Sequence, residues 1–146
     1  MKTLFSLIAF VILVSFSSLN AQSAEENWVP VDKIVSQTIF INTTGLKYFK
    51  EDDIYFWTLE KHNPPLIIES VDGKIAETKT YYLVNKKLKK YSIMDIIYYD
   101  QNENVLANYS YKRNMDNDKY KYNYPIMDDS QMAIIFNEVL KYVGEK

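Results

Sequence analysis

Residues 128–144, with the sequence DDSQMAIIFNEVLKYVG, decide the fold of this chain. Within them the apolar side chains recur at helical spacing and form a single stripe. Asp128 followed by Gln131 three residues later is the pattern of a capping box, and Gly144 is placed to cap the C-terminus. We therefore predict one amphipathic helix that must bury its stripe. The stripe consists of Met132, Ile135, Phe136, Val139 and Val143.

The residues before this helix alternate between apolar and polar with the period of two that is typical of β-strands. Turn signals separate the segments: Asp72-Gly73 is a tight-turn dipeptide, residues 100–103 close a hairpin, and Pro125 ends the last segment. Residues 62–65, HNPP, predict a loop because proline cannot donate to a strand ladder. The predicted strands are residues 37–42, 54–59, 77–84, 90–99, 104–112 and 119–124, with shorter segments at 46–49 and 66–68.

A helix with one apolar stripe beside an antiparallel meander must bury that stripe on one face of the sheet. The predicted fold class is therefore α+β, an antiparallel meander of about five to six strands with the C-terminal amphipathic helix packed on one face. Strand geometry also divides the side chains of residues 54–59 between two faces. Tyr55, Trp57 and Leu59 lie on one face, and Ile54, Phe56 and Thr58 lie on the other.

The first residues form a targeting segment rather than part of the domain. A basic residue precedes an apolar run at residues 4–16, which is followed by a short polar exit of small residues. The run of roughly 13 residues is shorter than the ~20 that span a bilayer. We predict a Sec-type signal peptide over residues 1–21, cleaved after Ala21 with Ala24 as the alternative. Residues 22–146 then form a single domain without a transmembrane span.

The composition of the chain excludes several kinds of chemistry. The absence of Cys excludes disulfides, cysteine-based zinc sites and thiol catalysis, and the single His excludes most histidine-based metal sites and catalytic triads. Removal of Lys2 with the signal peptide takes the net charge from −2 to −3, so no basic balance points to nucleic acid. We predict no cofactor, no metal site and no catalytic residues.

Two motifs resemble parts of functional sites but lack the other residues that those sites require. Residues 100–104 have the first three ligand spacings of a calcium loop, but Val105 stands at the glycine position and Tyr111 at the bidentate glutamate position. His62 has no Ser or Cys nearby, which favours an exposed loop residue over a general base. These residues are therefore interpreted as polar turns and surface.

A basic cluster is the first candidate for binding a partner. Lys86, Lys87, Lys89 and Lys90 concentrate positive charge in an otherwise acidic protein. They could contact anionic glycans, lipid head groups or acidic protein patches, and the alternative is a solvated hairpin end. Strand alternation would place Lys87 and Lys89 on one side and Leu88 on the core side.

A set of tyrosines is the second candidate. Tyr120, Tyr122 and Tyr124 alternate within the last predicted strand and would present one aromatic face. Tyrosine combines a large contact area with a polar tip, which suits an interface. The alternative is that this face packs under the helix.

The order of these segments resembles the surface-adhesin protein E family. The matching segments are residues 28–31 (WVPV) at the first strand, 82–86 (YLVNK) at the central strand, 98–105 (YYDQNENV) at a hairpin, and 125–143 at the last helix. Both cysteines of the family are absent, with Asn85 at the first position and Val143 or Gly144 at the second.

The resemblance implies an exported, non-enzymatic bacterial protein, in the periplasm or at the cell surface, that binds host or envelope proteins. Matrix components are among the partners that the family implies. A second hypothesis is a periplasmic inhibitor or immunity-type protein that occludes a partner enzyme, and a small carboxylate-based enzyme is a third. The partner is expected to be a protein rather than nucleic acid, and a homo-oligomer is compatible with the sequence.

Overall fold

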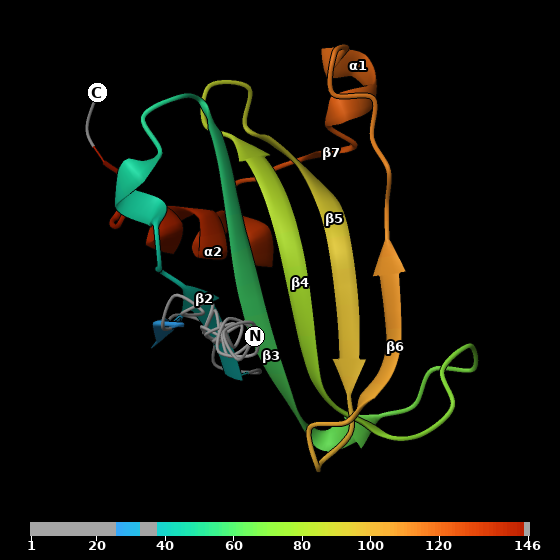
Figure 1. Ribbon diagram of the computed structural model, residues 1–146. Helices are drawn as coiled ribbons and strands as arrows, with labels where there is room; N and C mark the ends of the chain where they lie inside the picture. Colours follow the sequence, from blue (N-terminus) through green and yellow to red (C-terminus); the bar gives the residue numbers. More distant parts are fainter. Residues whose placement is uncertain (1–25, 33–37, 145–146) are drawn as a thin grey trace, which may run out of the picture.

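One antiparallel sheet dominates the computed structural model, which describes residues 26–32 and 38–144 (Figure 1). Six strands pair in chain order, and β7 pairs with β5. The predicted signal peptide, residues 1–21, lies outside the described residues. The strands are β1 (Trp28–Pro30), β2 (Thr38–Asn42), β3 (Asp53–Leu66), β4 (Ile75–Asn85), β5 (Lys90–Tyr99), β6 (Val105–Ser110) and β7 (Tyr124–Pro125). The described helices are the 3-10 helix η1 (Leu46–Tyr48), α1 (Asp118–Lys121) and α2 (Gln131–Leu140).

The α+β class is confirmed, with a sheet that has more strands than predicted. The described part of the chain contains seven strands, not five to six. The difference comes from β1 and β7, which have three and two residues. Strands of this length are too short for a period of two to appear in the sequence.

The hydrophobic core lies between α2 and one face of the sheet. In Figure 1, α2 runs behind β3 and β4. Ile54 and Phe56 of β3 and Val84 of β4 are buried there against the helix. Each of these strands therefore places alternate side chains under α2, as the predicted stripe requires. The helix contributes Met132, Ala133, Ile135, Phe136 and Val139 to this core.

The limits of α2 differ from the prediction at both ends. Ser130, not Asp128, caps the N-terminus, because its hydroxyl accepts the Ala133 N–H at 3.1 Å. The helix ends at Leu140, before Gly144. Gly144 instead packs against the backbone of η1, where an added Cβ would lie 2.3 Å from the Lys47 carbonyl oxygen. Its small size is needed for a tertiary contact rather than for a helix cap.

Strand β3 continues through the predicted HNPP loop. Lys61 still pairs with Glu77, and the ladder resumes where Leu66 pairs with Ile75. Residues 62–65 form the irregular part between these pairs and include a cis Asn63–Pro64 bond. The prolines are accommodated because they lie in this bulge, where the ladder does not require their missing N–H groups. Of the predicted short segments, residues 46–49 largely form η1, and only Leu66 of 66–68 is in a strand.

The predicted strand over residues 119–124 is wrong. The structure has the short helix α1 here, followed by the two residues of β7. The carbonyl oxygen of Asn117 accepts the N–H groups of Tyr120 and Lys121, and its side-chain oxygen accepts the N–H of Lys119. These local hydrogen bonds satisfy the backbone in a turn of helix and override the alternation of tyrosines and lysines.

Candidate functional site

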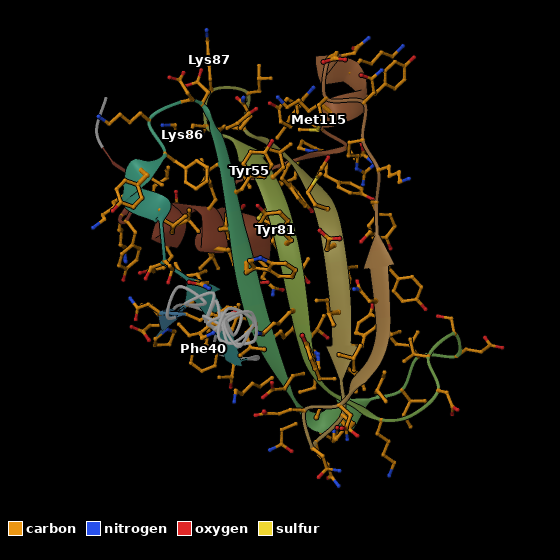
Figure 2. All side chains as sticks on the ribbon, viewed as in Figure 1. Phe40, Tyr55, Tyr81, Lys86, Lys87 and Met115 are labelled. Carbon is orange, nitrogen blue, oxygen red and sulfur yellow. The ribbon has the colours of Figure 1, made fainter. Side chains whose placement is uncertain are left out.

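A row of aromatic rings lies on the sheet face that α2 leaves open, with Phe49 at its edge, where this ring also packs against the core. We call it the aromatic face and define it by Phe49, Tyr55, Trp57 and Tyr81. The ring centroids of Phe49 and Tyr55 are 6.2 Å apart, those of Tyr55 and Tyr81 6.0 Å, and those of Trp57 and Tyr81 4.8 Å. Figure 2 shows Tyr55 and Tyr81 on the side of the sheet opposite α2.

Strand pairing explains why these rings meet. Trp57 of β3 is directly opposite Tyr81 of β4, and their rings stack with an interplanar angle of 24°. Tyr55 is two residues from Trp57 on the same face of β3 and therefore reaches Tyr81 diagonally. All three side chains are half-buried, so they pack against one another while still contacting solvent.

A hollow of about 360 Å³ lies beside the aromatic face. Its polar lining consists of Asn42 at the end of β2, Thr44 and Gly45 in the following turn, and Tyr48 of η1. None of the residues that line it is charged. The remaining lining residues are Phe49, Tyr55, Phe56, Trp57 and Tyr81.

A second hollow, of about 350 Å³, has a charged lining. Lys79 is one of the residues that line it, with its Nζ atom 3.2 Å from Glu26 Oε2, 5.2 Å from the Trp28 ring centroid and 5.9 Å from the Tyr99 ring centroid. Burial alone would raise the pKa of the Glu26 carboxyl, but hydrogen bonds from Trp28 and Lys79 outweigh burial and hold that pKa below its usual value. The Glu26 carboxyl therefore remains charged near neutral pH.

A polar cluster closes one end of the open face. We call it the Asp53 cluster and define it by Asp53, Asn85, Lys121 and Tyr122. Lys121 Nζ lies 2.5 Å from Asp53 Oδ2, the Tyr122 hydroxyl donates to Asp53 Oδ1, and the Asn85 amide donates to the same oxygen at 2.7 Å. Burial would raise the pKa of the Asp53 carboxyl, but the hydrogen bonds from Lys121, Tyr122 and Asn85 hold it below its usual value.

The Asp53 cluster fixes the segment that contains α1 to the sheet. Ser92 of β5 supports the same contact, because its hydroxyl donates to the Lys121 carbonyl oxygen at 2.7 Å and accepts the Asn123 N–H at 3.0 Å. The chain after β6 is thereby held over the end of the open face, where Leu83 is fully buried. The rest of the open face, including the aromatic face, keeps its solvent contact.

The predicted basic cluster lies at the turn between β4 and β5. Residues 86–89 form the turn and Lys90 begins β5 (Figure 2). The predicted alternation of Lys87, Leu88 and Lys89 is wrong because these residues are not in a strand. Leu88 is 44% exposed rather than directed to the core, and Lys89 adopts a φ of 47°.

The three predicted tyrosines do not form one face. Tyr122 is buried, with 5% of its surface exposed, and its hydroxyl is committed to Asp53. Tyr120 and Tyr124 are exposed. Tyr124 pairs with Tyr91, next to the pair of Pro125 with Lys90, so the structure brings this tyrosine close to the basic cluster. Tyr122 therefore has a structural role, and only the other two tyrosines are accessible to a partner.

The other candidate motifs have structural explanations. The Asp100 carboxylate accepts the N–H groups of Asn102 and Asn104 and the Asn104 amide, which makes it the organiser of the β5–β6 turn. His62 is not an exposed loop residue: its side chain is 5% exposed and its Nε2 lies 2.8 Å from Thr78 Oγ1. Within the described ranges, no group of three or more His, Cys, Asp or Glu residues could hold a metal ion.

The aromatic face is the site that the sequence did not single out. The alternation in β3 correctly placed Tyr55 and Trp57 on one face of a strand. The sequence does not indicate which face of β3 the helix α2 covers, because Ile54 and Phe56 on one face are just as apolar as Tyr55 and Trp57 on the other.

The comparisons with known proteins name no relative. No family model, no curated protein and no solved structure matches this chain. Among the residues that the structure describes, no helix has the length and apolar character needed to cross a membrane.

Proposed function

We propose that this chain is an exported, non-enzymatic binding protein of the bacterial envelope that binds a host or envelope protein through its aromatic face. The observation that carries the proposal is the row formed by Tyr55, Trp57 and Tyr81, with Phe49 at its edge, on the sheet face opposite α2. The resemblance of the chain to surface-adhesin protein E supports the class of partner.

The chemistry of the rings suits a contact with another protein. Tyrosine and tryptophan offer a large apolar area with a polar tip, so they tolerate water before binding and gain apolar burial after it. Such residues dominate the energetics of many interfaces when they lie near the centre of the contact. The stacking of Trp57 on Tyr81 limits the motion of both rings, which lowers the entropy that they lose when a partner binds.

The two hollows beside this contact differ in the charge of the residues that line them. The uncharged hollow adjoins Tyr55, and the hollow around Lys79 adds the ion pairs Lys79–Glu26 and Lys61–Glu77. A central apolar contact with charged groups at its edge is the usual anatomy of a protein interface. The ion pairs would then influence the association rate more than the affinity.

Binding to immobilised matrix proteins and to envelope extract tests the proposal. We expect the exported protein to bind at least one of them, and Trp57→Ala to weaken that binding at least tenfold. Tyr120→Ala is the matched control, because it removes an exposed ring that lies outside the aromatic face. Equal binding by parent and Trp57→Ala would contradict the role of this face.

The same face could instead occlude an envelope enzyme, which is the inhibitor hypothesis. Labelling of intact cells with a membrane-impermeant reagent separates the two functions. A labelled protein supports contact with host proteins, whereas protection from the label together with capture of an envelope enzyme favours the inhibitor.

A further inference from the structure

We propose that the uncharged hollow beside the aromatic face binds one neutral pyranose ring of a glycan. The inference rests on the proposed function, because the hollow shares Tyr55, Trp57 and Tyr81 with the face that would contact the partner. The inference adds to the proposed function the chemical class of the group that enters the hollow.

The lining matches the two kinds of surface that a sugar presents. The C–H groups of a pyranose form apolar faces that pack on aromatic rings, and its hydroxyls need neutral donors and acceptors. Phe49, Tyr55 and Trp57 supply the rings. The Asn42 carboxamide supplies a polar group with a fixed orientation, because its oxygen accepts the Thr44 N–H at 2.9 Å. A mostly apolar pocket with a few positioned polar groups is the usual form of a small-molecule site.

The absence of charge in the lining selects a neutral ligand. One quarter of the chain is charged, yet no Lys, Arg, Asp or Glu lines this hollow. A charged ligand that entered it would lose hydration without gaining an ion pair, which is unfavourable. Burial raises the pKa of the Tyr55 phenol, and the Asp53 carboxylate adds to the rise. Its hydroxyl therefore stays protonated and can donate to a sugar oxygen.

The size of the hollow limits what it can take. Its volume of about 360 Å³ lies near the lower end of the ~300–1,000 Å³ that is typical of ligand sites. That space suits one or two sugar rings and is too small for a folded peptide element. For a neutral ligand of this size we expect a Kd on the order of 1 mM.

Tyr48 is the lining residue whose substitution best tests the role of the hollow. It is 74% exposed, the highest value among the large aromatic residues at this face, so packing of the fold does not explain its position. Tyr48 is one of the residues that line the hollow, and Lys47 Nζ lies 5.1 Å from its ring centroid without lining the hollow itself. The ring could close over a sugar that already rests on Trp57.

Fluorescence titration with defined sugars tests the proposal. The probes are galactose, glucose and N-acetylglucosamine, with glucuronate as a charged comparison. The Trp28→Phe protein leaves Trp57 as the single tryptophan, so that any change reports on the hollow. We expect a saturable change with at least one neutral sugar and none with glucuronate. A desialylated glycopeptide and a neutral bacterial polysaccharide, titrated in parallel, distinguish a host glycan from an envelope glycan.

Two variants decide whether the signal comes from this site. Tyr48→Ala should weaken sugar binding about tenfold, since one aromatic contact is worth roughly that factor, and it should leave the fold intact. Tyr120→Ala should change the Kd less than about twofold, as expected for an exposed ring away from the site. No saturable change with any neutral sugar, or equal binding by Tyr48→Ala and parent, would overturn the proposal. Capture of a protein partner that persists when sugar binding fails would leave the proposed function standing.

Discussion

The two faces of β3 differ in what covers them rather than in how apolar they are. Phe56, 3% exposed, points under α2, whereas its neighbour Trp57 points to the open face and is half-buried. The covered side chains are mainly aliphatic or phenylalanine and contact the helix stripe, with Tyr82 and Tyr91 packed against them. The open side chains are mainly tyrosine and tryptophan, which contact one another.

The side chains of the open face are of types that can remain in contact with water. The tyrosine and tryptophan rings there have polar tips, and each ring buries part of its surface against the next ring. A face of Ile and Val in the same place would expose an apolar patch that promotes aggregation. The covered face therefore serves stability, and the open face is available for binding. Five predictions test this division, from the largest expected effect to the smallest.

Phe136→Ala should have the largest effect on stability. Phe136 is 5% exposed and lies in the core between α2 and the sheet. Truncation of a buried phenylalanine costs about 3–5 kcal/mol, a large fraction of the ~5–15 kcal/mol that stabilises a domain. Denaturant melts measure the loss. A change below about 1 kcal/mol would mean that the covered face does not hold the fold together.

The pair Phe56→Ala and Trp57→Ala compares the two faces at adjacent positions of β3. Phe56→Ala should cost about 3–5 kcal/mol of stability, whereas Trp57→Ala should cost less, because part of the tryptophan ring already contacts water. In partner binding the order should reverse, with a loss of about 2 kcal/mol or more for Trp57→Ala in protein that is still folded. Melts and binding assays on both variants measure this. A larger stability loss for Trp57→Ala than for Phe56→Ala would remove the distinction between the faces.

Asp53→Asn tests the cluster that closes the end of the open face. It removes the charge that holds Lys121, Tyr122 and Asn85, and we expect a loss of about 1–3 kcal/mol near neutral pH. Asp116→Asn, on the exposed segment before α1, is the control and should be nearly neutral. Equal melts for the two variants would show that the cluster does not stabilise the protein.

The acid sensitivity of the protein should depend on the same carboxylate. The pKa of Asp53 is lowered in the folded state, so its contribution is fully present above the unfolded pKa of about 3.9 and is lost as the pH falls through the folded value. The parent should therefore lose more stability than Asp53→Asn between about pH 5 and pH 2. Melts over this range measure the difference. Parallel pH profiles would contradict the linkage.

Replacing Lys87 and Lys89 together by Gln should have the smallest effect on stability. Both residues are exposed in the β4–β5 turn, so we expect a change within about 0.5 kcal/mol. If the turn contacts an anionic partner, the double variant should associate more slowly and the difference should shrink at high salt. Association rates at two salt concentrations measure this. Identical rates for the variant and the parent would leave the aromatic face and the exposed Tyr120 and Tyr124 as the remaining candidate sites.

Local sequence patterns determined the elements of this fold. The periods of the hydrophobic residues located α2 and strands β2 to β6 along the chain, but not the limits of α2 or the full length of β3. The α+β class follows from one amphipathic helix beside a meander. These features depend on spacing along the chain. The same reasoning failed at residues 119–124, where hydrogen bonds to Asn117 favour a turn of helix over the alternating pattern.

Only the tertiary structure decided where a partner can bind. Ile54 and Phe56 compete with Tyr55 and Trp57 for the same helix, and the sequence of β3 contains no feature that says which pair α2 will cover. Packing across the strands decides it. Phe56 stacks on Tyr82 against the core beneath α2, whereas Trp57 stacks on Tyr81 on the other face. The sequence likewise does not show that Tyr122 is buried, because it alternates with polar residues just as the exposed Tyr120 and Tyr124 do. Its burial accompanies a long-range hydrogen bond to Asp53.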